Sequence, residues 1–284
     1  MTRAALISLL VLSGCVQARP AAQAQDIVPL RIVSMNPCVD TILMEVAEPA
    51  QIAAISHYSH DPRATSVPLQ WATQYPAVSG AAEDVIAAEP DLVIAGPHVS
   101  IQTIAALKRL GIPLMQVAVP ETVAESKRQI SDITARIGQP QSGALLNARI
   151  DAAMTAANTN SRATPALIWQ GSGLVPGKGT LADELLTRTD FQNLSAALGL
   201  KKWDIVSLER LLSAPPVVLL TGQANMGAGN ADANRMLSHP VLRKVGARIQ
   251  VAHYPSSLLH CGGPIIIKSV ARLVEVRRSL EAKR

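Results

Sequence analysis

The feature that most constrains the fold is a sequence unit that occurs twice. In residues 83–95, Glu83 opens a helical pattern that stops at Pro90, and the apolar run 92–95 follows at once. Residues 209–221 repeat this order, with Glu209 at the start and a second apolar run after a proline pair. Each unit predicts a helix, a tight turn and a buried strand. We therefore expect two similar α/β lobes with a ligand cleft between them.

The length and one helical segment set the expected domain plan. A chain of 284 residues exceeds what one core usually supports, so two domains of roughly 120 to 150 residues are expected. Residues 142–157 carry an apolar stripe at helical spacing and would span about 24 Å. The predicted fold is α/β, with two Rossmann-like lobes joined by one long rigid helix. The predicted boundaries are an N-terminal lobe at 27–140, the connecting helix at 141–160 and a C-terminal lobe at 161–284.

Composition and charge exclude several classes of protein. The chain is 48% hydrophobic and 17% charged, as expected of a globular interior. The net charge of +5 is spread out, and no run of Lys or Arg is long enough for a nucleic-acid partner. The basic C-terminus is interpreted as the solvated face of a helix, and its members are Arg272, Arg277, Arg278, Lys283 and Arg284.

The N-terminus indicates export. Residues 1–24 are interpreted as a signal peptide and tether, because Arg3 precedes an apolar run, 4–12, that is too short to span a bilayer. The sequence ending in Cys15 resembles a bacterial lipobox, in which the cysteine is lipidated. Cleavage after Ala24 is the competing interpretation. The expected location is the periplasm, with Cys15 as the favoured lipid anchor.

Cleavage at either site leaves Cys38 and Cys261 as the remaining pair in an oxidising compartment. A disulfide between them would join the two lobes, and the sequence cannot supply the required separation of about 4.4 to 6.8 Å between Cα atoms. Two free thiols in tight turns are the favoured interpretation.

Loops at the ends of predicted strands supply the candidate ligand contacts, because ligands of open α/β sheets bind there. Asn36 and Pro37 follow the first strand, and His57, Tyr58 and His60 follow the second. Two histidines three residues apart could hold a metal, but on a loop this is a weak signal, and a ligand-facing or solvated role is favoured.

In the second half of the chain, Gly171, Ser172 and Lys178 lie in a glycine-rich loop after a predicted strand. A phosphate-binding loop is disfavoured, because Ser172 falls where its first glycine would be and Gly179 stands where Ser or Thr must bind magnesium. The glycines are interpreted as a tight turn close to a bound ligand. Trp203 and Tyr254 complete the candidate contacts.

Taken in order, these segments resemble the helical-backbone (class III) periplasmic binding proteins, which deliver iron-siderophores, haem or cobalamin to ATP-binding-cassette importers. The resemblance covers nearly the whole chain after the signal peptide. It is carried by residues 31–34 with Pro37, Glu83 with 90–95, residues 110–113, residues 207–212 around Glu209, and Gly263-Pro264.

The resemblance implies an exported, non-enzymatic, monomeric substrate-binding protein without a cofactor, whose partners are a permease dimer and a metal chelate or corrinoid. Glu83 and Glu209 would dock onto arginines of the permease. The loop residues named above would bind the ligand: Asn36, Pro37, His57, Tyr58, His60, Gly171, Ser172, Lys178, Trp203 and Tyr254. With few arginines near the expected cleft and only three Trp, three Tyr and one Phe in the chain, the ligand stays open between a corrinoid and a neutral iron chelate.

Two alternative functions would use other chemistry. The first is a binding protein for a bare divalent ion, zinc or manganese, held through His57, His60, His98 or His253. The second is an enzyme with Ser172 or Cys38 as nucleophile and His57 or His260 as base, which is disfavoured because no nucleophile and base share a recognisable arrangement.

Overall fold

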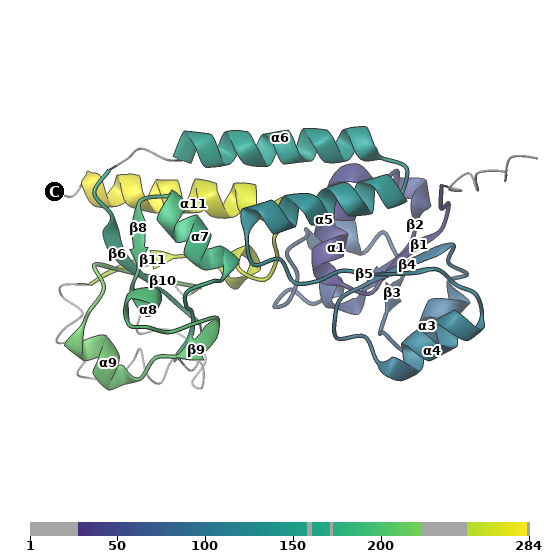
Figure 1. Ribbon diagram of the computed structural model, residues 1–284, viewed down its shortest axis with the longest axis horizontal. Helices are drawn as coiled ribbons and strands as arrows, with labels where there is room; N and C mark the ends of the chain where they lie inside the picture. The colour runs from purple at the N-terminus through teal and green to yellow at the C-terminus, as the bar shows by residue number, and fades with distance from the viewer. Residues whose placement is uncertain (1–27, 158–160, 171–172, 223–248, 283–284) are drawn as a thin grey trace, which may run out of the picture.

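The computed structural model describes residues 28–157, 161–170, 173–222 and 249–282. It has two α/β lobes side by side, with one long helix running along both (Figure 1). The predicted fold class is confirmed. The predicted signal peptide and tether, with Cys15, and the glycine-loop residues Gly171 and Ser172 lie outside the described residues.

The first lobe is built on a five-stranded parallel sheet of order β3-β2-β1-β4-β5. Its strands are β1 (Ile32–Ser34), β2 (Ile52–Ser56), β3 (Ala77–Val78), β4 (Leu92–Ala95) and β5 (Leu114–Gln116). The connections contain α1 (Pro37–Val46), η1 (Pro49–Gln51), η2 (His57–His60), α2 (Leu69–Ala72), α3 (Ala82–Ala87), α4 (Ile101–Arg109) and α5 (Val123–Arg136). Strands β1 and β4 are buried along their whole length, as their continuous apolar sequences predict.

The second lobe has a four-stranded parallel sheet of order β11-β10-β6-β8. Its strands are β6 (Thr164–Trp169), β8 (Phe191–Asn193), β10 (Val218–Thr221) and β11 (Gln250–His253). An antiparallel ribbon of β7 (Leu174–Pro176) and β9 (Trp203–Ile205) is separate from this sheet. The described helices are α7 (Leu181–Arg188), α8 (Leu194–Ala197), α9 (Leu208–Ser213), η4 (Ser256–Leu258) and α11 (Ile265–Glu281).

The repeated unit occupies the same place in both lobes. Helix α3 leads into β4, which pairs with β1, and α9 leads into β10, which pairs with β6. In each sheet, chain order reverses between these two strands, so each lobe has a switch point there. Ligands of open α/β sheets bind beyond the carboxyl ends of the strands at such points.

The connector is α6 (Pro140–Ala157), an 18-residue helix of about 27 Å. It begins two residues before the predicted stripe, because Pro140 fits the first turn of a helix. Its buried face packs on α5 and α11 (Figure 1). The contact with α5 is close, because a Cβ on Gly143 would lie 2.1 Å from Oγ1 of Thr134.

One hydrophobic cluster extends through both lobes. It includes Ile32 and Ile94 of the first sheet, Ile168 and Leu220 of the second, and the buried faces of α6 and α11. The two sheets are therefore coupled through a shared layer of packed side chains, which opposes independent movement of the lobes.

One prediction about α11 is wrong. Arg277 was expected on a solvated face, but its side chain is buried and forms an ion pair with the buried carboxylate of Asp190. Helical spacing alone could not reveal this, since Asp190 is distant in sequence. Arg278 is exposed as predicted, and Arg272 pairs with Glu275 at 2.7 Å. Within the described ranges, none of the helices is both long and apolar enough to cross a bilayer.

Candidate ligand-binding site

A cavity of about 680 Å³ lies between the two lobes. The first lobe lines it with Asn36, Cys38, Ala118, Val119, Pro120, Glu121 and Gln129. The second lobe contributes Gln170, Leu174, Thr180, Leu181, Ala182, Lys202, Trp203, Leu259, His260, Cys261 and Gly262. Each wall includes a residue just beyond the carboxyl end of a central strand, Asn36 after β1 and Gln170 after β6, so the cavity lies where the sheet topology predicts a ligand.

Asn36 marks the switch point of the first lobe. It follows β1 and caps α1, accepting a hydrogen bond on Oδ1 from the backbone N–H of Cys38 at 2.8 Å. Gly96, which follows the neighbouring strand β4, gives it room: a Cβ there would lie 2.6 Å from Nδ2 of Asn36. The sequence around Asn36-Pro37 therefore starts a helix and places an amide in the cavity wall at the same time.

Trp203 and Gln170 form part of the opposite wall. Gln170 follows β6, and Trp203 begins β9 with 46% of its surface exposed. Thr180 caps α7 by accepting a hydrogen bond from the N–H of Asp183 at 3.2 Å. This wall offers the ligand one large aromatic surface and a small number of polar groups.

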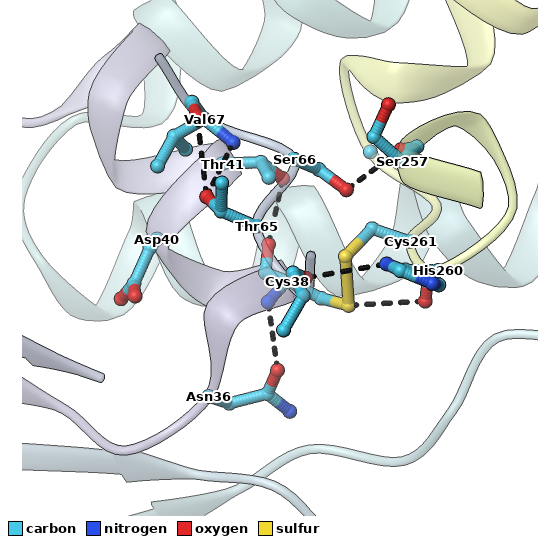
Figure 2. The surroundings of a disulfide bond; sticks show 12 residues. Asn36, Cys38, Asp40, Thr41, Thr65, Ser66, Val67, Ser257, His260 and Cys261 are labelled. Atoms are coloured by element: carbon cyan, nitrogen blue, oxygen red, sulfur yellow. Dashed lines mark hydrogen bonds between the residues drawn. A yellow bond between two sulfur atoms is a disulfide. The ribbon is translucent and has the colours of Figure 1, made fainter. Parts of the chain in front are cut away.

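A disulfide joins Cys38 of the first lobe to Cys261 of the second, with Cα atoms 5.1 Å apart (Figure 2). The favoured interpretation of two free thiols is wrong, because the fold brings the start of α1 against the loop before α11. Cys38 is consequently no thiolate nucleophile in this structure, which removes that version of the enzyme alternative. Both cysteines line the cavity, so the bridge is part of its wall.

Hydrogen bonds from the first lobe hold the segment around Cys261 on both sides. Ser66 Oγ donates to the carbonyl of Ser257 at 2.7 Å (Figure 2), and the N–H of Gly263 donates to Ser126 Oγ at 2.7 Å. A Cβ on Gly262 would lie 2.7 Å from that same Oγ, so the close approach requires glycine. The segment is therefore a rigid wall that belongs to one lobe in sequence and contacts the other in space.

The charged side chains among the described lining residues are Glu121 and Lys202, and they form an ion pair across the two lobes. Lys202 Nζ also donates to the carbonyl of Gly179 at 3.2 Å. The residue adopts a φ of +55°, which is uncommon for lysine. Because the two charges compensate each other, the cavity presents little net charge to a ligand.

Two of the predicted ligand contacts, Asn36 and Trp203, line the cavity together. Pro37 is the first residue of α1, beside Asn36, and is not part of the lining. Lys178 is exposed outside it, although Thr180 two residues later lines the wall. Of the described part of the glycine-rich loop, Thr180 lines the cavity and Lys178 does not.

The structure places Tyr254 in the core instead of the ligand wall. Only 1% of its surface is exposed, and burial raises the pKa of its hydroxyl to about 12, opposed by a hydrogen bond with Ser269 of α11. The residue directly after β11 is turned inward because α11 covers that end of the sheet.

The η2 segment lies outside the cavity lining. Tyr58 and His57 are exposed with ring centroids 4.1 Å apart, and His57 Nδ1 lies 3.1 Å from the carbonyl oxygen of Val78. His60 is half-buried. Within the described residues, no three side chains of His, Cys, Asp or Glu come together as a metal site, so the bare-cation alternative has no supporting geometry.

Asp40 anchors η2 to α1. Its Oδ2 accepts hydrogen bonds from the N–H of Ser56 at 3.1 Å and the hydroxyl of Ser59 at 2.5 Å. Burial raises the pKa of this carboxyl to about 7, and hydrogen bonds with Ser34, Ser59 and Ser56 oppose the shift without cancelling it. A buried acid thus fixes the loop that follows β2.

Glu83 and Glu209 are both exposed in the first turns of α3 and α9. Those helices lie at opposite ends of the molecule, both on the side away from α6 (Figure 1). Interactions with its own backbone N–H and with the Ser207 hydroxyl lower the pKa of Glu209.

Sequence reasoning did not predict several lining residues as ligand contacts, above all Gln170, the pair of Glu121 and Lys202, and His260, which was considered only as a base in the enzyme alternative. His260 precedes the Cys261-Gly262-Gly263-Pro264 motif, which contributed to the family resemblance but was not assigned a ligand contact. The closely packed glycines of that motif were the available signal that the segment meets another part of the chain.

Comparison with known proteins supports this architecture. A family model described as periplasmic binding protein matches residues 32–255. No curated protein matches the chain. Similar solved structures include the periplasmic haem-binding protein RhuT from Roseiflexus sp. RS-1, with 22% identity and a TM-score of 0.66 over 87% of this chain and 95% of that one.

Two proteins of Vibrio cholerae have the same fold. The periplasmic haem-binding protein HutB has 17% identity and a TM-score of 0.69, covering 87% of this chain and 98% of that chain. The periplasmic vitamin B12-binding protein BtuF has 19% identity and a TM-score of 0.68, covering 89% and 98%. At these identities the similarity establishes the fold and leaves the ligand open.

Proposed function

This chain belongs to the periplasmic binding protein family, and from that premise we propose that it captures a corrinoid or a neutral iron chelate between its lobes and delivers it to the permease of an ATP-binding-cassette importer. The observation that carries the proposal is the cavity of about 680 Å³ between the lobes, at the switch points of both sheets. Its volume is in the range of small-molecule sites.

The chemistry of the wall favours a ligand with little net charge. The two charged lining groups, Glu121 and Lys202, pair with each other, and amides of Asn36, Gln129 and Gln170 supply neutral donors and acceptors. A strongly anionic ferric siderophore would need several cationic partners, because buried charges must be compensated. The amide-bearing rim of a corrinoid, or a neutral iron chelate, matches this wall better.

Solved structures with this fold include proteins named for haem and for vitamin B12. That range fits a shared cleft whose wall chemistry differs between proteins. We expect the ligand here to lie against the indole of Trp203, the exposed aromatic side chain of the lining.

Delivery would use the exposed carboxylates of Glu83 and Glu209. Two charges at opposite ends of a rigid body can orient it on a symmetric permease dimer and raise the association rate more than the affinity. The protein would act in the periplasm as a monomer, with Cys15 as its lipid anchor, and it would perform no chemical step on its ligand.

The decisive experiment is a thermal-shift screen of the mature protein against cobalamin, cobinamide, haem, and neutral and anionic ferric siderophores. A ligand at 100 times its dissociation constant stabilises the folded state by about 2.7 kcal/mol. We expect a corrinoid or a neutral chelate to raise the melting temperature, with little effect from the anionic siderophores.

Two aromatic variants locate the binding. Trp203→Ala should weaken it, whereas Tyr58→Ala should not, because Tyr58 is similarly exposed, at 52%, but lies outside the cavity. If no compound in the panel stabilises the wild-type protein, the proposed ligand class is wrong. Equal effects of the two variants would place the site elsewhere.

A further inference from the structure

One lining residue, His260, has a feature that the proposed function does not use. Its side chain is exposed at the cavity wall, directly before Cys261. It comes from the segment between β11 and α11, in which the sequence predicted Tyr254, and not His260, as the ligand contact.

The hydrogen bond of the ring defines which nitrogen is available. Nδ1 of His260 lies 3.2 Å from the backbone carbonyl oxygen of Ala64. A carbonyl oxygen only accepts hydrogen bonds, so Nδ1 carries the proton. In the neutral ring, Nε2 then keeps a lone pair. A histidine that binds a metal commonly has this arrangement, with its other nitrogen donating to a backbone carbonyl.

The backbone of His260 is fixed as firmly as its ring. The next residue forms the disulfide with Cys38, and Sγ of Cys38 lies 3.3 Å from the carbonyl oxygen of His260 (Figure 2). Ala64 and Cys38 both belong to the first lobe, so the opposite lobe holds the ring of His260 at Nδ1 and its backbone through the adjacent disulfide. Such preorganisation is what a precise binding contact requires.

His57 shows that a hydrogen bond from Nδ1 to a backbone carbonyl is not enough to make a histidine a candidate metal ligand. Its Nδ1 also faces a backbone carbonyl, that of Val78, at 3.1 Å, and its ring is exposed. It lies outside the cavity lining, next to Tyr58. His260 combines the free Nε2 with a place in the cavity, and His57 has only the first property.

From these observations we propose that Nε2 of His260 coordinates the metal of the bound ligand. The ligand is then a metal complex with one exchangeable axial position, such as an incomplete corrinoid or a planar iron chelate. This inference rests on the proposed function and narrows its ligand class. One protein nitrogen is enough, because the chelator fills the other positions, whereas a bare cation would need a cluster that the described residues lack.

The step is a ligand exchange at the metal. A water molecule leaves the axial position with its own electron pair, and the lone pair of Nε2 forms the new bond. No oxidation state changes and no proton is transferred, since Nδ1 keeps its proton in the hydrogen bond with Ala64.

The test uses the full mature protein with its disulfide intact, in the variants His260→Ala and His57→Ala. The probes are aquocobinamide and ferric haem. Both are followed by absorption spectroscopy, and ferric haem also by electron paramagnetic resonance. We expect the wild type and His57→Ala to give the spectrum of a nitrogen-coordinated metal. His260→Ala should bind at least about 10-fold more weakly and keep the water-coordinated spectrum. Added imidazole should restore the nitrogen-coordinated spectrum, which a purely structural role of His260 would not predict.

Each result separates this inference from the function on which it rests. If the wild type binds a probe and His260→Ala gives the same spectrum, coordination by His260 is refuted and the proposed function stands. The same holds if the wild type binds only chelates whose coordination is saturated. If the wild type binds no metal complex, both fail. Circular dichroism and a thiol assay on each variant check that the fold and the disulfide are retained.

Discussion

Asp40 offers a quantitative test of the local electrostatics around the first strand-to-helix turn. Its carboxyl is fully buried in the first turn of α1, and burial raises its pKa to about 7 from an ordinary value of 3.8. Replacing it with asparagine keeps the shape and the capacity to accept from Ser56 and Ser59 but removes the ionisable group. We therefore expect Asp40→Asn to remove a pH-dependent loss of stability.

The direction in which stability changes with pH follows from proton binding by Asp40. Between pH values near 4 and near 7, the folded state holds a proton on Asp40 that the unfolded chain has released, so stability falls as the pH rises through this range and is level above it. A shift of roughly three pKa units corresponds to about 4 kcal/mol in total. Between pH 5 and pH 8 the expected loss is about 2 to 3 kcal/mol.

The assay is urea unfolding of the wild type and Asp40→Asn at pH 5 and pH 8, followed by circular dichroism. The difference in unfolding free energy between the two proteins should shift by about 2 to 3 kcal/mol in favour of the variant at the higher pH. Asp132→Asn is the control, because Asp132 is exposed on α5 and its replacement removes the same charge without relieving burial. A difference that stays constant between the two pH values would show that Asp40 ionises as in the unfolded chain, and would refute the reasoning.

Three further outcomes are expected. Replacing Cys38 and Cys261 by serine frees a loop with a sequence separation of 223, for which chain entropy predicts a loss of about 5 kcal/mol; an unchanged urea midpoint would contradict a closed bridge. Arg277→Met removes the cation facing the buried Asp190 carboxylate and should cost about 3 to 5 kcal/mol, whereas Arg278→Met, on the exposed face, should change the melting temperature little. Small-angle scattering should show almost no contraction when ligand is added, because α6, the shared core and the disulfide all oppose lobe closure, and a large contraction would contradict this.

The elements of the fold were predictable because each depends on a local pattern. In each copy of the repeated unit, the proline after the helix and the apolar run that follows lie within a few residues of each other. The first copy forms the central strand β4, and the second forms β10. The stripe of residues 142–157 likewise identified α6, and the error at its start is one of position only, since Pro140 both prevents a preceding helix from continuing and begins the next one.

The errors concern side chains whose environment depends on distant segments. Arg277 and Tyr254 both belong to the packing of α11, and that helix was placed in sequence but not in space. Arg277 has the spacing of a solvated helical face but is buried, because it pairs with Asp190, which is 87 residues away in sequence. A tyrosine after a strand is buried because α11 covers it.

The histidines show that sequence alone did not predict which of their side chains line the cavity. His57 and His60 attracted attention because they are close together in the chain, yet neither lines the cavity. His260 has no histidine neighbour in sequence, and its position depends on Ala64 and Cys38, both from the opposite lobe. Residues that are close in sequence can form a site only within one loop. A cleft between two lobes instead combines segments that come together only after folding. A ligand contact in such a cleft is therefore better sought beside sequence features that need a distant partner, such as Cys261 and the closely packed glycines after it, than in local clusters of reactive side chains.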